Sequence, residues 1–142
     1  MLKAYKYRIY PNKMQTLLLN KTFGCVRYFW NQNVAIFNSY DKETNPTPEF
    51  KTVKELREDT QWMKEVSFNA VQQKERDFEE FKKQRFSKSR KKAIGDPKFK
   101  KKSNRQSFRL ANNKFKIVEN RIQLEKIGKV RMVVDTYSLG FH

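Results

Sequence analysis

Apolar and polar residues alternate near both ends of the chain and follow a helical period between them. Residues 2–10 (LKAYKYRIY) place Tyr5, Tyr7 and Ile9 on one face and basic side chains on the other, which is typical of a strand that ends before Pro11. The same two-residue period recurs later at Phe108 and Leu110, Phe115 and Ile117, Ile122 and Leu124, and Val130, Met132 and Val134. Asn112-Asn113 and Glu119-Asn120 stand where tight turns are needed. We therefore expect the N-terminal strand to pair with the C-terminal strands, with the helices forming an insertion between them.

Helix signals fill the region between these strands. Asn12 and Gln15 have the spacing of a capping box and predict a long helix to about Tyr40, in which Gly24 marks a kink or a close backbone approach. Thr52 and Glu55 form a second box that opens a short helix to about Asp59, and Ser67 caps a third helix over 68–86. The apolar stripes of the long helices are Leu19, Phe23, Val26, Trp30, Val34 and Phe37 in the first and Phe68, Val71, Phe78 and Phe81 in the last.

Charge then identifies the kind of partner. The chain has 32 Lys and Arg against 15 Asp and Glu, a formal net charge of +17, so a polyanion would relieve its self-repulsion and release counterions. No uncharged apolar run approaches the ~20 residues of a spanning helix, and the N-terminus lacks the apolar stretch of a signal peptide. We therefore expect no membrane partner and a cytoplasmic location, with which the single Cys25 is consistent. Aromatic residues at 14% predict a folded core and not a disordered basic tail.

Basic residues concentrate between Lys82 and Arg105. The twelve are Lys82, Lys83, Arg85, Lys88, Arg90, Lys91, Lys92, Lys98, Lys100, Lys101, Lys102 and Arg105, against Asp96 alone. Phe86 and Phe99 interleave with the charges, which favours nucleic-acid phosphate binding over a merely solvated loop. Gly95 and Pro97 predict that the later half is extended or looped. Amides that could contact a base edge lie on the preceding helix, at Asn69, Gln72 and Gln73.

Residues for catalysis are not assembled by the sequence. Glu75, Asp77, Glu79 and Glu80 are close together, but Glu79 and Lys83 have the spacing of a surface ion pair, so a solvated helix face is the better interpretation. The only histidine is the last residue, His142, and with one cysteine there is no zinc motif. Cys25, beside Val26, is interpreted as a small core residue. We expect no metal, no cofactor and no enzymatic activity of this chain alone.

Four motifs in order resemble the N-terminal part of the TnpB (OrfB) family of insertion-sequence proteins, RNA-guided nucleases related to the ancestors of type V CRISPR effectors. They are YKYRIYPNKMQTLLLNKTFGCVRYFWN, QWMKEVSFNAVQQ, GDPKFKKKSNRQSFRL and FKIVENRIQLEKIGKVRM, and together they cover roughly residues 2–134. The resemblance implies an α+β fold in which a partial, wedge-like β-barrel is interrupted by a helical recognition domain. The implied boundaries are 1–11 for the first barrel strand, 12–93 for the recognition domain, 94–134 for the remaining strands and 135–142 for an unmatched tail.

The resemblance also implies partners and site residues. In such proteins these two domains hold a structured guide RNA and read a short motif in double-stranded DNA beside the target. By motif position Gln72 resembles the base-contacting glutamine, Asn69 lies near it, and Phe50 resembles an aromatic near the same DNA motif. Phosphate contacts are expected from the basic residues Lys82, Arg85, Lys88, Arg90, Lys98, Lys100, Lys101, Lys102, Arg105 and Arg109.

The chain departs from the family where the nuclease would follow. Residues 135–142 (DTYSLGFH) match nothing in the family pattern, and the RuvC carboxylates are absent from the sequence given. We therefore expect a bacterial or phage-encoded protein that binds guide RNA and DNA without cleaving, as a truncated or split form working with a separate RuvC-type nuclease chain. Two alternatives stay open: a non-cleaving regulator or inhibitor that occupies the guide RNA or the target-adjacent DNA, and a generic basic RNA-binding protein.

Overall fold

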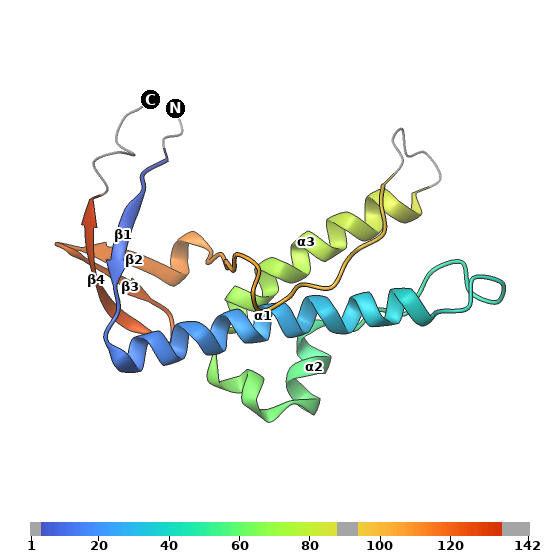
Figure 1. Ribbon diagram of the computed structural model, residues 1–142, viewed down its shortest axis with the longest axis horizontal. Coiled ribbons are helices and arrows are strands. Elements are labelled where there is room, and N and C mark those ends of the chain that lie inside the picture. The colour runs from blue at the N-terminus through green and yellow to red at the C-terminus, as the bar shows by residue number, and fades with distance from the viewer. Residues whose placement is uncertain (1–3, 88–93, 135–142) are drawn as a thin grey trace.

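A computed structural model describes residues 4–87 and 94–134 (Figure 1). The elements in chain order are β1 (Tyr7–Tyr10), α1 (Lys13–Ser39), α2 (Val53–Asp59), the 3-10 helix η1 (Gln61–Glu65), α3 (Phe68–Phe86), the 3-10 helix η2 (Asn112–Lys114), β2 (Phe115–Val118), β3 (Arg121–Leu124) and β4 (Gly128–Val134). The order of strand, helices, strands agrees with the order that the apolar pattern predicts. None of the helices in the described part of the chain is long and apolar enough to cross a membrane.

Three predicted helix starts are confirmed by their caps. The Asn12 side chain accepts from the Gln15 amide at 2.8 Å, and the Gln15 side chain accepts from the Asn12 amide at 2.9 Å, so α1 opens with a complete capping box. Thr52 caps α2 and Ser67 caps α3. α1 continues through Gly24, and a Cβ there would come no closer than 3.9 Å to the Arg27 guanidinium, so the alternative of a close backbone approach is not supported and the kink stays a prediction.

The four strands form one antiparallel sheet in the order β1-β4-β3-β2. The predicted pairing of the N-terminal strand with a C-terminal strand is confirmed, because Ile9 lies opposite Met132. The turn at Glu119-Asn120 is also confirmed, with Glu119 at a φ of 56°. Gln15 ties the start of α1 to this sheet by donating from its side-chain amide to the Lys129 carbonyl at 2.8 Å.

The predicted partial barrel is not supported. β1 and β2 are the two edges of an open sheet among the described residues and do not pair with each other, so these four strands do not close into a barrel. The expected strand around Phe108 and Leu110 is wrong as well, because residues 105–110 are extended but join no ladder. Their alternation instead reflects packing of Phe108 against α1. The mixed α+β class is retained, and the proposed domain boundaries stay a prediction.

Two clusters of buried side chains hold the elements together. The larger lies among α1, α2, η1 and α3, and its most buried large members are Phe29, Phe78 and Met63. The smaller lies between α1 and the sheet, where Leu19 packs with Val130. Phe108 packs against both clusters, so the extended segment before the last strands joins the helical part to the sheet.

Candidate nucleic-acid interface

Residues 97–111, called here the basic strap, run beside α1 and α3 without regular secondary structure and turn at 101–104, where the Asn104 amide donates to the Lys101 carbonyl at 3.0 Å (Figure 1). The strap carries most of the predicted phosphate-binding residues that the structure describes: Lys98, Lys100, Lys101, Lys102, Arg105 and Arg109, all exposed. Phe99 lies between two of them with 52% of its surface exposed. An exposed ring among cations offers a base a stacking surface beside phosphate-binding groups.

Side chains of α1 fix the path of the strap. The Trp30 indole donates to the Lys98 carbonyl at 2.8 Å. Asn31 makes a two-way contact with the backbone of Lys100, donating to its carbonyl at 2.9 Å and accepting from its amide at 2.7 Å. The Arg27 guanidinium donates to the Gln106 side chain at 2.7 Å. Since these bonds use the strap's backbone and one glutamine, they leave its lysine ammonium groups available to an anion.

Side chains of α3 hold the C-terminal end of the strap. Arg109 donates to the Gln73 carbonyl at 3.0 Å and forms an ion pair with Asp77. The Asn69 side-chain oxygen accepts from the Ala111 amide at 2.8 Å. Asn69 is buried, and its side-chain oxygen holds the strap through this bond. The sequence had suggested Asn69 as a DNA contact, whereas the structure shows it bonded to the protein's own backbone.

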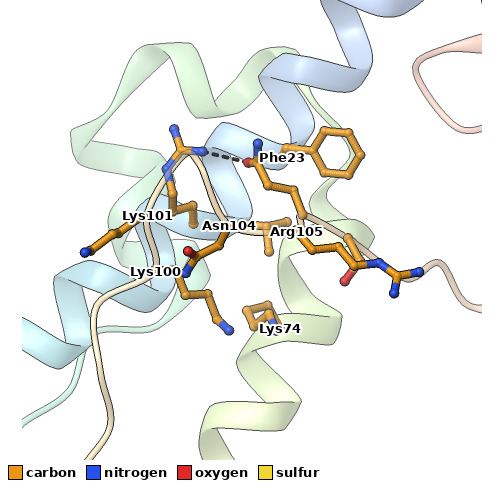
Figure 2. A pocket seen from close by; sticks show the side chains of 10 residues that line it. Phe23, Lys74, Lys100, Lys101, Asn104 and Arg105 are labelled. Carbon is orange, nitrogen blue, oxygen red and sulfur yellow. Dashed lines mark hydrogen bonds between the residues drawn. The ribbon is translucent and has the colours of Figure 1, made fainter.

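A pocket of about 90 Å³ opens where the strap crosses α1 and α3 (Figure 2). Its lining comprises five basic residues and no acidic one: Arg27, Lys74, Lys100, Lys101 and Arg105, with Phe23, Val26, Asn104, Gln106 and Ser107. Lys74 and Lys100 both stand over the Trp30 ring, at 5.4 and 4.9 Å from its centroid. Figure 2 shows Lys101 and Arg105 directed outward on opposite sides of the pocket, so its cations can engage several phosphates.

Lys100 shows the electrostatic consequence of this crowding. Burial lowers the pKa of its ammonium group, and the neighbouring Lys74 lowers that pKa further, while Asp77 acts in the opposite direction. Asp77 is already shared between Lys74, at 3.4 Å, and Arg109. A phosphate beside Lys100 would favour its charged form, so this part of the strap is suited to an anion.

The other predicted phosphate contacts lie at the far end of α3. Lys82 pairs with Glu79 at 3.3 Å, and its ammonium group stands 5.6 Å from the Phe50 centroid. Arg85 pairs with Asp96 at 3.3 Å. Lys88 and Arg90 fall outside the described residues. These two described cations are therefore more strongly engaged within the protein than the exposed lysines of the strap.

The residues predicted to read a DNA motif are not brought into one group. Gln72 lies on α3 beside Asn69, whose amide donates to the Gln72 side-chain oxygen at 3.4 Å. Phe50 packs edge-on against Phe78, and their ring centroids are 4.8 Å apart. Phe78 lies six residues beyond Gln72 on α3, about 9 Å further along the helix axis, so Phe50 and Gln72 do not lie side by side. Gln73, next to Gln72, lines the groove beside the strap with Arg109. Direct readout by Gln72 or Phe50 stays a prediction.

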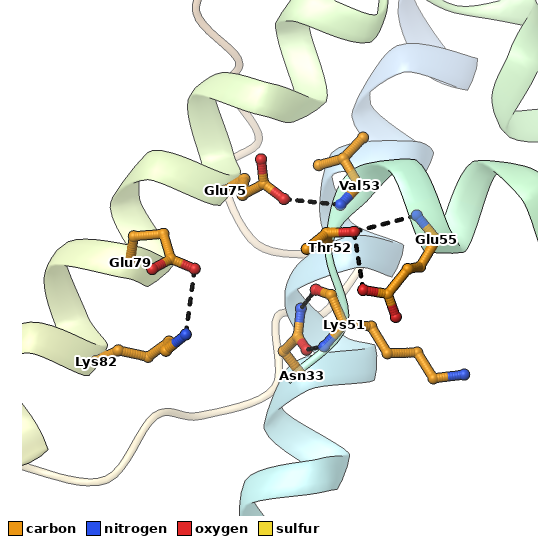
Figure 3. Close-up of polar contacts among 8 residues, drawn as sticks. All are labelled: Asn33, Lys51, Thr52, Val53, Glu55, Glu75, Glu79 and Lys82. Carbon is orange, nitrogen blue, oxygen red and sulfur yellow. Dashed lines mark hydrogen bonds and ion pairs between the residues drawn. The ribbon is translucent and has the colours of Figure 1, made fainter. Parts of the chain in front are cut away.

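The acidic residues of α3 have individual structural partners (Figure 3). Glu75 accepts from the Val53 amide at 2.8 Å and thereby helps to cap α2, which contradicts its assignment to a solvated face. Glu79 pairs with Lys82 and not with the predicted Lys83. No group of three or more His, Cys, Asp or Glu residues within 4–87 and 94–134 is placed to hold a metal ion.

Cys25 is a core residue, as its position beside Val26 predicts. Its side chain is fully buried, and burial raises the pKa of the thiol to about 11. Glu65 adds to this effect, whereas Arg57 and Lys21 oppose it. The thiol is therefore protonated at neutral pH and unsuited to nucleophilic chemistry.

Sequence reasoning missed the residues that build the strap's support. Trp30 was predicted only as part of an apolar stripe, and Arg27, Asn31 and Lys74 were not singled out. A usable signal existed, because Trp30-Asn31 places an indole donor and an amide side by side, and buried polar groups of this kind normally have partners. What the sequence does not show is which segment supplies those partners, since Lys98 lies 68 residues away.

The basic strap, the five-cation pocket and the helices beneath them form a cationic surface of the kind that contacts nucleic-acid phosphates. Residues 1–49 match the family model of the helix-turn-helix domain of OrfB proteins of the IS605 group, and helix-turn-helix domains bind DNA. This match supports membership of residues 1–49 in the N-terminal region of the TnpB/OrfB family of insertion-sequence proteins. No curated protein matches the chain.

The matched segment differs from a helix-turn-helix in one respect. Within its described residues it contains β1 and the single uninterrupted helix α1, followed by a loop, and the next helix begins only at Val53. A helix-turn-helix needs a second, recognition helix after a short turn. The match therefore indicates DNA binding without assigning the groove-reading element, and contacts of the strap and α3 have to be argued from their own geometry.

Proposed function

We propose that the protein binds a structured guide-like RNA and target-adjacent DNA, as a relative of TnpB nucleases that works with a separate RuvC-type nuclease chain. The observation that carries this proposal is the basic strap. Its backbone is fixed on α1 by Trp30 and Asn31 while its lysines remain exposed. A row of cations on a fixed backbone binds phosphates at a lower conformational-entropy cost than a flexible tail does.

The proposal divides the surface between the two nucleic acids. The strap and the pocket beside it supply sequence-independent phosphate contacts, which position a nucleic acid without selecting its sequence. Gln72, on the adjacent helix, supplies the amide that would contact a base edge of duplex DNA. The family match over residues 1–49 supports the DNA part, and the resemblance of the later motifs supports the RNA part.

Salt dependence tests the strap directly. Lys101, Lys102 and Arg105 are exposed, so the triple change Lys101→Gln, Lys102→Gln, Arg105→Gln should remove three phosphate contacts. On duplex DNA the slope of log affinity against log salt should then fall by about 2–3, because each contact contributes ~0.9. The control triple Lys51→Gln, Lys54→Gln, Lys64→Gln removes the same charge from exposed sites on the α2 side. Equal slopes for both variants would contradict a phosphate-binding role of the strap.

Bound RNA tests the guide-linked part of the proposal. The protein purified from its host should carry one defined structured RNA, which sequencing would identify. A heterogeneous mixture would contradict the guide-linked function and leave a generic RNA-binding protein. If the single RNA is found, adding the protein to a RuvC-type nuclease from the neighbouring reading frame should increase targeted cleavage; inhibition would instead identify a regulator.

We further propose that the chain has no nuclease activity by itself. Its acidic residues on α3 are engaged by Val53, Lys82, Arg109 and Lys74, and none of these contacts leaves carboxylates converging on one point. Purified protein should leave labelled DNA and RNA intact in the presence of Mg²⁺ or Mn²⁺. Metal-dependent cleavage that disappears on mutating a single Asp or Glu would contradict this.

A further inference from the structure

The face of the sheet that points away from α1 is basic, and the proposed function does not use it. Val130 and Met132 are buried toward α1, so their neighbours on β4 point to the opposite side. Strand register then assigns the other members of this face. The outer face comprises Arg8 and Tyr10 on β1, Lys116 and Val118 on β2, Arg121 and Gln123 on β3, and Lys129, Arg131 and Val133 on β4.

The five cations of the outer face are exposed and form no ion pair among the described residues. The paired strand positions of this face hold no Asp or Glu, and among the described residues none of the five lies within 4.0 Å of a carboxylate. Glu125, just after β3, lines a cavity with Lys116 and Gln123, but its ion pair is with Lys114. Arg121 and Arg131 lie directly opposite each other on neighbouring strands. Like charges in this position destabilise a sheet, because their Cβ atoms are only about 5 Å apart. An anion bound over this pair would remove the repulsion.

Tyr10 adds an aromatic surface to the same row. It lies directly opposite Arg131, whose guanidinium stands 5.3 Å from the ring centroid, and 46% of the tyrosine surface is exposed. The row across the sheet therefore runs Tyr10, Arg131, Arg121 and Val118, with Lys129, Gln123 and Lys116 in the next row. An exposed ring, a planar guanidinium and flanking cations are the groups that bind an unstacked base together with its phosphates.

We propose that the outer face of the sheet binds a single-stranded nucleic-acid segment, with phosphates on Arg121 and Arg131 and a base stacked on Tyr10. A duplex is disfavoured because its bases are stacked inside and its major groove, about 12 Å wide, admits a helix or a two-stranded ribbon and not a four-stranded sheet. Single strands expose the π-faces that Tyr10 can use. RNA and DNA share this chemistry, so the experiment below includes both.

This surface is separate from the basic strap. The strap packs against α1 and α3, whereas the outer face lies on the side of the sheet opposite the buried Val130 and Met132. The two surfaces can therefore be occupied at the same time by different segments of nucleic acid. Loss of one should leave the other intact, which makes this inference testable independently of the proposed function.

The test compares two charge-matched variants of the full-length chain. Arg121→Gln with Arg131→Gln changes the outer face, and Lys54→Gln with Lys64→Gln changes exposed sites elsewhere by the same two charges. Affinities for a labelled single-stranded oligonucleotide, as RNA and as DNA, and for a duplex of the same sequence would be measured by fluorescence anisotropy over a range of salt. The arginine variant should bind single strands at least about tenfold more weakly at low salt and lose ~1.4 from the salt slope, at ~0.7 per contact.

Tyr10→Leu tests stacking, because leucine keeps an apolar side chain without a ring. It should weaken single-strand binding ~5- to 100-fold and leave duplex binding unchanged. Acetylation of lysines in the unaltered protein provides a second measurement, which does not depend on whether a variant folds. A bound oligonucleotide should slow the acetylation of Lys116 and Lys129 but not that of Lys54. Equal losses in the arginine and control variants, an unaffected Tyr10→Leu, or unprotected Lys116 and Lys129 would each overturn the proposal. If the strap variant kept the duplex salt slope of the unaltered protein while the arginine variant lost single-strand binding, this inference would stand and the proposed function would fail.

Discussion

Trp30 on α1 donates its indole N–H to the carbonyl of Lys98 at 2.8 Å, and this bond attaches the basic strap to the longest helix. The same ring lies under the ammonium groups of Lys74 and Lys100. One side chain therefore fixes the strap's backbone and supports two of the pocket's cations. Through these contacts Trp30 on α1 determines where the lysines of the strap and the pocket lie.

Trp30→Phe should distinguish the contribution of the indole hydrogen bond from that of the aromatic ring. The variant keeps an aromatic side chain but loses the N–H donor, so we expect ~1 kcal/mol lower unfolding free energy in urea and weaker nucleic-acid binding as the strap loosens. Trp62→Phe is the matched control, since Trp62 is 45% exposed and packs against Tyr28 instead. If both variants bind nucleic acid like the unaltered protein, the bond to Lys98 has no part in presenting the strap.

Ser67 should link the stability of α3 to the sheet in a pH-dependent way. Its hydroxyl accepts from the Ala70 amide and donates to Glu125 at 2.6 Å. That donation is the main reason why the pKa of Glu125 is lowered from its usual value of 4.5, with Lys114 acting in the same direction and burial opposing it. A lowered carboxyl pKa stabilises the fold above the unfolded pKa, and this contribution is lost as pH falls from about 4.5 through the folded-state pKa.

Ser67→Ala should therefore lower the unfolding free energy by ~1–2 kcal/mol at pH 7 and reduce the further loss seen on acidification. Urea unfolding at pH 7 and at a series of values below 4.5 would measure both effects. Thr52→Ala is the control, because it removes the cap of α2 through a contact with Glu55 that does not reach the sheet. An acid dependence equal to that of the unaltered protein would show that the Ser67–Glu125 bond is not what lowers the pKa.

Gln72→Ala tests base reading against a surface role. The side chain is half-buried and holds only the 3.4 Å contact from Asn69, so we expect a stability change within ~0.5 kcal/mol. If Gln72 contacts a base edge, affinity for one preferred duplex should fall by ~1–3 kcal/mol in a library measured at fixed salt, and affinity for other sequences should change little. Gln84→Ala, on the exposed part of the same helix, is the control. Uniform losses across the library would exclude base reading.

Cys25 should be unreactive until the protein unfolds. With its side chain fully buried and its thiol pKa raised to about 11, a disulfide reagent at pH 8 should modify it slowly in the native state and rapidly in guanidinium. Cys25→Ser should lower the unfolding free energy more than Cys25→Ala does, by about 1–3 kcal/mol, because the serine hydroxyl would be buried without a hydrogen-bond partner. Rapid modification of the native protein would show that this part of α1 opens readily.

Local features account for what the sequence by itself determined. The capping box at Asn12 and the single caps at Thr52 and Ser67 act within three residues, so their helix starts could be predicted from spacing alone. The pairing of residues 7–10 with a late strand followed from two alternating patterns that each needed a partner. Net charge identified a polyanionic partner, because charge does not depend on how the chain folds.

Only the tertiary structure decided which distant groups meet. Glu75 lies 22 residues from the Val53 amide that it binds, and Trp30 lies 68 residues from Lys98, so neither spacing carries a local signal. Residues 105–110 alternate between apolar and polar side chains like a strand, yet they join no sheet, and Phe108 packs between the two clusters. Period-two alternation shows that one side of the segment is buried; it does not show that the backbone is hydrogen-bonded to a neighbouring strand. Strand order placed Arg121 opposite Arg131 on a face without acids, and an antiparallel register cannot be derived from charge content.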